Sequence, residues 1–215
     1  MVHQTTPGSA TSKRRERERV ARRDDILRAA REVFGSRGFQ EATLDEVASR
    51  AEVAKGTLYN YFRSKEEIFH QIVTDLLDDI LALAERAAGT GQSPRDAFQQ
   101  YARHMMAYYL EHGDVFRIVA REMFRLEVEE GNRRIREVHR RVDEVAVVLA
   151  RALGEETRPR RPGQPTPREL TQMFISMIHH RTIRWLFNEQ GTLELDPHEE
   201  SQLITKIFFD GAASV

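Results

Sequence analysis

The histidines are the residues whose spacing could support metal binding or acid–base catalysis. His179 and His180 are adjacent, and Glu67 with His70 forms one Glu-x-x-His pair. Neighbouring residues of a helix point to different sides, and a dinuclear metal bundle needs a second Glu-x-x-His copy with further carboxylates. We therefore expect solvated or hydrogen-bonded histidines, no metal site and no cofactor.

Other patterns that could carry enzymatic chemistry are weak. The chain has 215 residues and no cysteine, which excludes disulfides, thiolate zinc sites and cysteine nucleophiles. The glycine-containing segment GTGQS at residues 89–93 lacks the dinucleotide-binding spacing, and GSRG at 35–38 is typical of a helix end rather than a nucleophile elbow. We expect no catalytic residues and a protein that is not an enzyme, with a helical enzyme as the weaker alternative.

The segment KGTLYNYF, residues 55–62, has hydrogen-bonding and aromatic residues where the flanking pattern predicts a helix. Gly56 costs such a helix roughly 1 kcal/mol against alanine. Helical spacing turns Leu58 and Phe62 inward and leaves an outward face without an acid. Glycine permits close approach to a phosphate, and hydroxyl and amide groups bind phosphates or base edges. The pattern favours contact with DNA over an ordinary surface helix with half-buried aromatics.

Three neighbouring helices are predicted to position this segment. The first begins near Arg22 and stops at Gly35 and Gly38. The second runs from Leu44 to near Ala51 after a capping box of a threonine and a glutamate. A second capping box, Ser64 with Glu67, begins the helix that follows residues 55–62. A helix, a tight turn and a second short helix, braced by a preceding helix, form a helix-turn-helix arrangement.

The stretch ATLDEVASRAEVAKGTLYNYFRSKEEIFHQIV, residues 42–73, resembles the DNA-binding region of the TetR family of bacterial transcriptional regulators. The resemblance implies an all-α fold, with an N-terminal three-helix helix-turn-helix DNA-binding domain and a larger C-terminal helical ligand-binding and dimerisation domain. It places these residues on the operator: Thr43, Lys55, Gly56, Thr57, Tyr59, Asn60, Tyr61 and Lys65. Glu52 stands where family members often have glycine, and Ala54 where they often have serine, so the turn and the helix cap depart from the pattern.

The N-terminal residues differ in charge from the remainder. Segment 13–23, KRRERERVARR, has seven basic and two acidic residues, whereas the whole chain has a net charge of -1. We expect residues 1–20 to form a flexible basic arm that can lie along phosphates, with a solvated disordered tail as the alternative. The predicted domains are then the arm, the helix-turn-helix domain over 21–68 and the helical domain over 69–215.

The C-terminal two thirds show helical periodicity in five further segments. These are expected from about 94 to 113, 114 to 127, about 132 to 149, 167 to 189 and 196 to 209, with an exposed proline-rich connection over 154–167. Methionines and aromatics that could line an apolar ligand pocket, or equally form ordinary core, are Met105, Tyr109, Phe116, Met123, Met173 and Met177. The last two helices have more apolar surface than one small domain is expected to bury. The family resemblance implies that they pair with a second copy; packing within the monomer is the alternative.

These patterns predict a homodimeric, ligand-responsive repressor that binds double-stranded DNA at a near-palindromic operator and is released by a small apolar effector. The alternative is an architectural DNA-binding protein without a ligand. The longest apolar run is VAVVLA at 145–150, far shorter than a membrane helix, and the N-terminus has no signal-peptide core. We expect a soluble cytoplasmic protein with no membrane partner.

Overall fold

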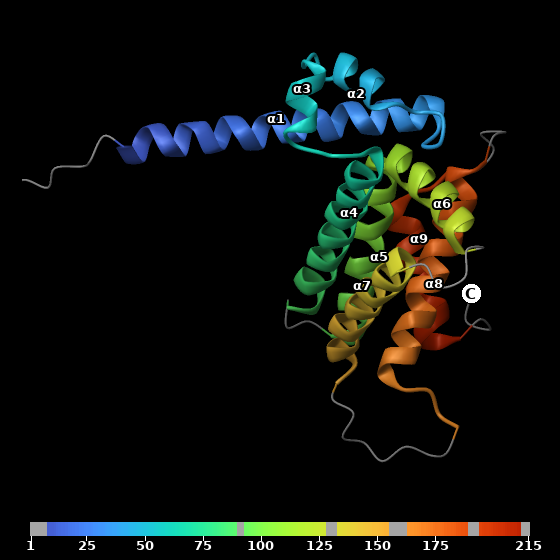
Figure 1. Cartoon of the computed structure of the whole chain (residues 1–215). Helices are drawn as coiled ribbons and strands as arrows, with labels where there is room; N and C mark the ends of the chain where they lie inside the picture. Colours follow the sequence, from blue (N-terminus) through green and yellow to red (C-terminus); the bar gives the residue numbers. More distant parts are fainter. Residues whose placement is uncertain (1–7, 90–92, 128–132, 155–162, 189–193, 212–215) are drawn as a thin grey trace, which may run out of the picture. The chain divides into compact units, whose positions relative to one another are not determined.

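The computed structural model describes residues 8–89, 93–127, 133–154, 163–188 and 194–211, and these residues form helices, turns and no strand (Figure 1). The all-α prediction is confirmed. The chain divides into two compact units, Met1–Val73 and Thr74–Val215. The prediction placed this boundary between residues 68 and 69. Helix α4, Lys65–Ala88, begins in the first unit and continues into the second.

The first unit contains α1 (Gly8–Arg37), α2 (Leu44–Arg50), α3 (Lys55–Tyr59) and the first turns of α4. Its core joins one apolar face of each helix. Phe39, between α1 and α2, lies against Phe34 and Phe69 with ring centroids 5.2 and 4.9 Å away. The other large buried side chains of this core are Ile26, Leu27, Val33, Val47, Leu58, Phe62, Ile68, Ile72 and Val73.

Helix α1 begins at Gly8, so the prediction that order starts near Arg22 is wrong for residues 8–21. This early part of α1 is exposed over residues 11–22 and has no apolar face for periodicity to detect. Arginine and glutamate are strong helix formers, and pairs such as Arg14–Glu18 at 3.4 Å and Glu16–Arg19 at 3.3 Å stabilise successive turns. Contact between this segment and DNA stays a prediction, and residues 1–7 of the predicted arm lie outside the described residues.

Helix α2 has the predicted start. The Thr43 hydroxyl accepts from the Glu46 amide at 3.3 Å, and the Glu46 carboxylate accepts from the Thr43 amide at 2.9 Å. At the other end, Val53 N–H donates to Ala48 O at 3.0 Å and Glu52 N–H to Ser49 O at 3.2 Å. This pair of bonds is a Schellman motif, which requires a left-handed residue just after the helix. Glu52 takes that role with φ +53, the conformation for which glycine is favoured.

The second unit contains the remainder of α4, α5 (Pro94–Glu111), α6 (Gly113–Glu127), α7 (Arg133–Ala150), the short 3-10 helix η1 (Arg151–Leu153), α8 (Pro167–Leu186) and α9 (Pro197–Asp210). The predicted start of α5 is confirmed, with Ser93 as N-cap and proline in the first turn. Helices α8 and α9 start in the same way, at Thr166 and Asp196. A proline suits a first turn because its missing N–H would have no partner there.

Helix α5 packs against both α8 and α9 at the centre of this unit (Figure 1). Its apolar stripe is buried over the whole length of the helix: Phe98, Tyr101, Met105 and Tyr109. The Phe98 ring lies 4.8 Å from the Phe174 ring of α8 and 5.5 Å from the Phe208 ring of α9. Aromatic packing thus joins the three helices.

Much of the apolar surface of α8 and α9 is already buried within this unit. Phe174, Ile178, Leu186 and Ile204 are each at most 6% exposed. These four side chains do not need a second copy to be buried, because α5 lies against both helices. Trp185, Leu203, Ile207 and Phe208 are half-buried. Among the described residues, no helix combines the length and apolarity needed to cross a membrane.

Candidate functional site

Helix α3 is shorter than predicted. It ends at Tyr59 rather than continuing to Phe62, and Asn60 follows as its C-cap. The amides of Asn60 and Tyr61 donate three residues back, to Thr57 O at 3.1 Å and Leu58 O at 2.9 Å, which tightens the last turn. The helix start has no side-chain cap because Ala54 occupies that position, as the sequence indicated.

The two faces of the α3 segment are oriented as predicted. Leu58 is fully buried, and the exposed fraction of Phe62 is only 2%. Tyr59 is 45% exposed, Gly56 and Asn60 are exposed, and Thr57 and Tyr61 are half-buried. This segment therefore combines two buried anchors with an exposed polar and aromatic face.

Gly56 has no role in the packing of the described protein. A Cβ atom built at this position meets nothing within 4 Å, and Gly56 is not among the glycines with positive φ. Alanine would fit the same backbone and favour the helix by roughly 1 kcal/mol. Packing among the described residues therefore gives no reason for a glycine at this position.

The charges beside α3 come from α2 as well as from Lys55. The Lys55 ammonium lies 2.8 Å from one carboxylate oxygen of Asp45 and 2.9 Å from the other. The hydrogen bond and the charge of Asp45 raise the pKa of Lys55. Thr43 is exposed, but its hydroxyl also donates to Glu46 at 2.9 Å. Hydrogen bonds from Thr43 lower the pKa of Glu46 and keep this cap ionised.

Lys65 is bound within the first unit. Its ammonium donates to the carbonyl oxygens of Phe39, Gln40 and Ala42, at 3.1, 2.5 and 3.2 Å, and lies 5.2 Å from the centroid of the Phe39 ring. Three acceptors match the three protons of an ammonium group. The side chain thus fastens the start of α4 to the α1–α2 loop, a role different from the predicted contact with the DNA backbone.

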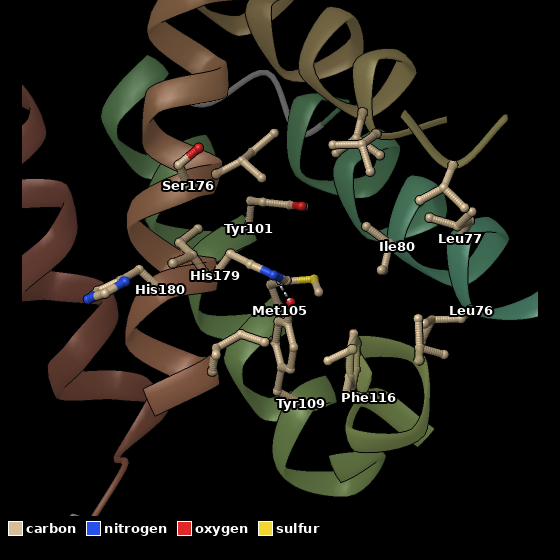
Figure 2. A pocket seen from close by; sticks show the side chains of 18 residues that line it. Leu76, Leu77, Ile80, Tyr101, Met105, Tyr109, Phe116, Ser176, His179 and His180 are labelled. Carbon is tan, nitrogen blue, oxygen red and sulfur yellow. Dashed lines mark hydrogen bonds between the residues drawn. The ribbon is translucent and has the colours of Figure 1, made fainter. Parts of the chain in front are cut away.

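The second unit encloses an apolar cavity of about 510 Å³ among α4 to α8 (Figure 2). Three of the six predicted pocket residues, Met105, Tyr109 and Phe116, line it. Met173 is 55% exposed and does not line it; neither does Met177. The Met123 side chain lies outside the described residues. Many of the other lining residues are aliphatic, among them Leu76, Leu77, Ile80, Val119, Val138, Val142, Val145, Ile175, Ile178 and Ile183.

Polar groups in the cavity come from α5 and α8. The Tyr109 hydroxyl and His179 Nδ1 are 2.5 Å apart and hydrogen-bonded, and Figure 2 shows both side chains directed toward the cavity. Part of the His179 residue is exposed, but burial of the ring and the charge of His180 lower its pKa. Burial raises the pKa of Tyr109. The pair is therefore uncharged at neutral pH.

Tyr101 adds a second polar group. Its side chain is 1% exposed, lines the cavity, and extends into it from α5 in Figure 2. Burial raises its pKa, so the hydroxyl keeps its proton. Tyr101 was not among the predicted pocket residues, and His179 was expected only to be a solvated or hydrogen-bonded histidine, which its bond to Tyr109 confirms. No cluster of potential metal ligands occurs among the side chains that the structure describes.

Comparisons with known proteins agree with this architecture. Residues 26–72 match the model of the bacterial regulatory proteins of the tetR family. This part of the chain is a tetR-family region. The matched residues include α2, α3 and the Schellman turn between them. They extend from Ile26 of the α1 core to Ile72 of α4.

Curated relatives match part of this chain. The transcriptional repressor KstR2 of Mycolicibacterium smegmatis is 32% identical over 75 residues, which are 35% of this chain and 37% of KstR2. The transcriptional activator FasR of the same species is 34% identical, over 40% of this chain and 42% of FasR. The chain thus matches less than half the length of these relatives.

The fold is shared with solved structures over most of the chain. The transcriptional regulator FadR of Bacillus subtilis, solved in complex with stearoyl-CoA, superposes with a TM-score of 0.67 at 20% identity. The superposition covers 87% of this chain and 97% of that one. The second unit therefore has the helical architecture of FadR.

Proposed function

We propose that this chain is a DNA-binding transcriptional regulator whose α3 segment reads the operator. The observation that carries the proposal is the exposed Gly56 beside Tyr59 and Asn60, which the packing of the free protein does not require. A groove or a phosphate close to the backbone gives glycine a physical purpose at this position. Tyr59 and Asn60 then offer an aromatic ring, a hydroxyl and an amide to base edges and phosphates.

The regulator acts as a repressor that binds as a homodimer. Two copies of α3 have to enter successive major grooves, about 34–36 Å apart, which matches a near-palindromic operator. Helices α8 and α9 supply the contact between copies through their outer faces. The tetR-family region and the similarity to the repressor KstR2 support this assignment.

A small apolar effector releases the repressor from DNA. Helix α4 is the physical link, because Ile68 and Ile72 lie in the core of the first unit while Leu76 and Ile80 line the cavity of the second. A ligand that binds one position of α4 more tightly than another shifts the population of DNA-binding states by that difference in affinity. The stearoyl-CoA complex of FadR supports a ligand site in this fold.

The reading face is tested with a triple variant, Thr57→Ala, Tyr59→Ala and Asn60→Ala. Operators are first selected from a random duplex library with the unaltered protein. We expect the triple variant to lose binding to them by at least 100-fold, since each lost specific contact costs about 1–3 kcal/mol.

The matched control is Ser36→Ala with Arg28→Ala on α1, which removes exposed polar groups of the same unit. Circular dichroism checks that both proteins remain helical. Full operator affinity in the triple variant would place the reading face elsewhere. A chain that selects no sequence at all would reject the regulator proposal.

A further inference from the structure

The cavity of the second unit has a chemical character that narrows the class of effector. No lysine, arginine, aspartate or glutamate is found among its described lining residues. An ionised ligand group placed inside would lose its hydration without gaining a counter-charge, which strongly disfavours binding. The enclosed part of the ligand is therefore uncharged.

The wall is not uniformly apolar, because five lining side chains have hydrogen-bonding atoms: Tyr101, Tyr109, Ser176, His179 and His180. The Tyr101 side chain is 1% exposed and lines the cavity, and no hydrogen bond of its hydroxyl is found among the described residues. A hydroxyl that lines a cavity without a protein partner can form a hydrogen bond with an oxygen atom of a ligand. This group is the clearest sign that the cavity is built for something besides hydrocarbon.

The Tyr109–His179 pair offers a further donor in either of its arrangements. If the Tyr109 hydroxyl donates to Nδ1, the neutral ring has its proton on Nε2. If Nδ1–H donates to the Tyr109 oxygen, the phenolic proton is left over. One N–H or O–H group therefore remains for a ligand in both cases. His180, the neighbour of His179, is also among the residues that line the cavity (Figure 2).

We propose that the effector is an uncharged, largely apolar molecule with a hydroxyl or carbonyl oxygen, which binds to Tyr101 and to the Tyr109–His179 pair. The proposal rests on the function proposed above, in which this cavity is the effector site. It differs from a simple transfer of the FadR ligand, because the described cavity wall has no cationic side chain to pair with the phosphates of an acyl-CoA.

The test compares decanol with decanoate, which have the same number of carbons but differ in charge at neutral pH. Each competes with the fluorescent apolar probe N-phenylnaphthylamine for the full-length protein in the absence of DNA. We expect decanol to displace the probe and decanoate to do so at least tenfold less well. Decanoate that binds as tightly as decanol would overturn the proposal.

Two single variants test which side chains bind the oxygen atom of decanol. Tyr101→Phe and Tyr109→Phe each remove one hydroxyl and keep the ring, so we expect each to weaken decanol about fivefold to tenfold and to leave probe affinity within about twofold. The matched control is Tyr108→Phe on the same helix, whose hydroxyl bonds Asp79 at 2.6 Å and which does not line the cavity. Unchanged decanol affinity in both cavity variants, or an equal loss in the control, would also overturn the proposal.

The same titrations separate this inference from the proposed function. Decanol is added to the complex of protein and selected operator, and anisotropy of the labelled duplex reports release. Binding of decanol with no change in operator affinity would reject the release step while leaving the ligand class established. When the proposed function and the proposed ligand class are both right, decanol releases the unaltered protein from the operator. The double variant Tyr101→Phe with Tyr109→Phe then loses this release.

Discussion

At the residue scale, two lysines near the proposed DNA interface have the same charge and different surroundings. Lys65 donates to three backbone carbonyls, whereas exposed Lys55 pairs with one exposed carboxylate of Asp45. We expect Lys65→Met to lower the free energy of unfolding by about 1–2 kcal/mol, because hydrogen bonds from a charged group are lost. Urea denaturation followed by circular dichroism measures the change. The salt dependence of operator binding should stay as it is.

Lys55→Met serves as the matched control with the opposite expectation. An exposed ion pair contributes little to stability, so the urea midpoint of unfolding should stay that of the unaltered protein. Loss of one phosphate contact should reduce the slope of log affinity against log salt by about one. If Lys65→Met keeps full stability and reduces the slope of log affinity against log salt, Lys65 contacts the phosphates instead.

Periodicity alone was sufficient for the inward residues of α3 but not for these lysines. Leu58 and Phe62 are four residues apart, so one helical face predicts both. The carbonyls that hold Lys65 belong to residues 39, 40 and 42, more than twenty positions earlier in the chain. No local pattern encodes such a contact. Met173 shows the same limit, since residue type suggested a pocket and the structure leaves the side chain exposed.

At the scale of elements, the turn between α2 and α3 contains a residue in an unfavourable conformation. Glu52 has φ +53 in a Schellman motif that glycine would occupy without steric cost. We expect Glu52→Gly to raise the free energy of unfolding by about 1 kcal/mol. A left-handed conformation costs a residue with a Cβ atom about 1–2 kcal/mol, and glycine avoids this cost. Part of the gain is lost because glycine also increases the conformational entropy of the unfolded chain. Chemical denaturation provides the measurement.

Glu52→Gln is the control for charge, since it removes the carboxylate and keeps the Cβ atom. It should have the stability of the unaltered protein within about 0.5 kcal/mol, because Glu52 is exposed. Equal stabilisation by both variants would assign the effect to the charge and not to the backbone.

Caps made most helix starts predictable, while the ends of α1 and α3 depended on other forces. Thr43, Ser93 and Thr166 accept hydrogen bonds from the third residue of their helices, as their sequence positions indicate. The first part of α1 has charge pairs and no apolar face, so a search for apolar periodicity passed over it. Helix α3 ends early because its last turn tightens before the chain reaches Phe62, whose side chain lies in the core. The early end is thus an effect of tertiary packing.

At the scale of the whole molecule, the proposed dimer needs a surface that the monomer leaves uncovered. Helix α8 buries Phe174, Ile178 and Leu186, and a second line of residues along the same helix is exposed or half-buried. That line follows helical spacing: Met173, Met177, His180, Arg184 and Phe187. Met173 and Phe187, which are 55% and 40% exposed, are the large apolar side chains that this line presents to a second copy.

We therefore expect Met173→Asp with Phe187→Asp to weaken the dimer. Burial of the two new charges at the interface costs about 3 kcal/mol in total. This cost raises the dissociation constant of the dimer by roughly 100-fold. Sedimentation velocity over a dilution series measures the monomer fraction. Operator affinity should fall with it, because a single α3 reads only one half-site.

The control is Val147→Asp on α7, a side chain of similar exposure, 42%, in the same unit. A charge at an exposed position outside the interface should leave the dimer unchanged, since water solvates it in both states. If Val147→Asp separates the copies while the α8 variant remains dimeric, the contact lies on α7 and the two reading helices are joined through that face. If both variants remain dimeric and keep full operator affinity, the outer face of α8 is not part of the interface.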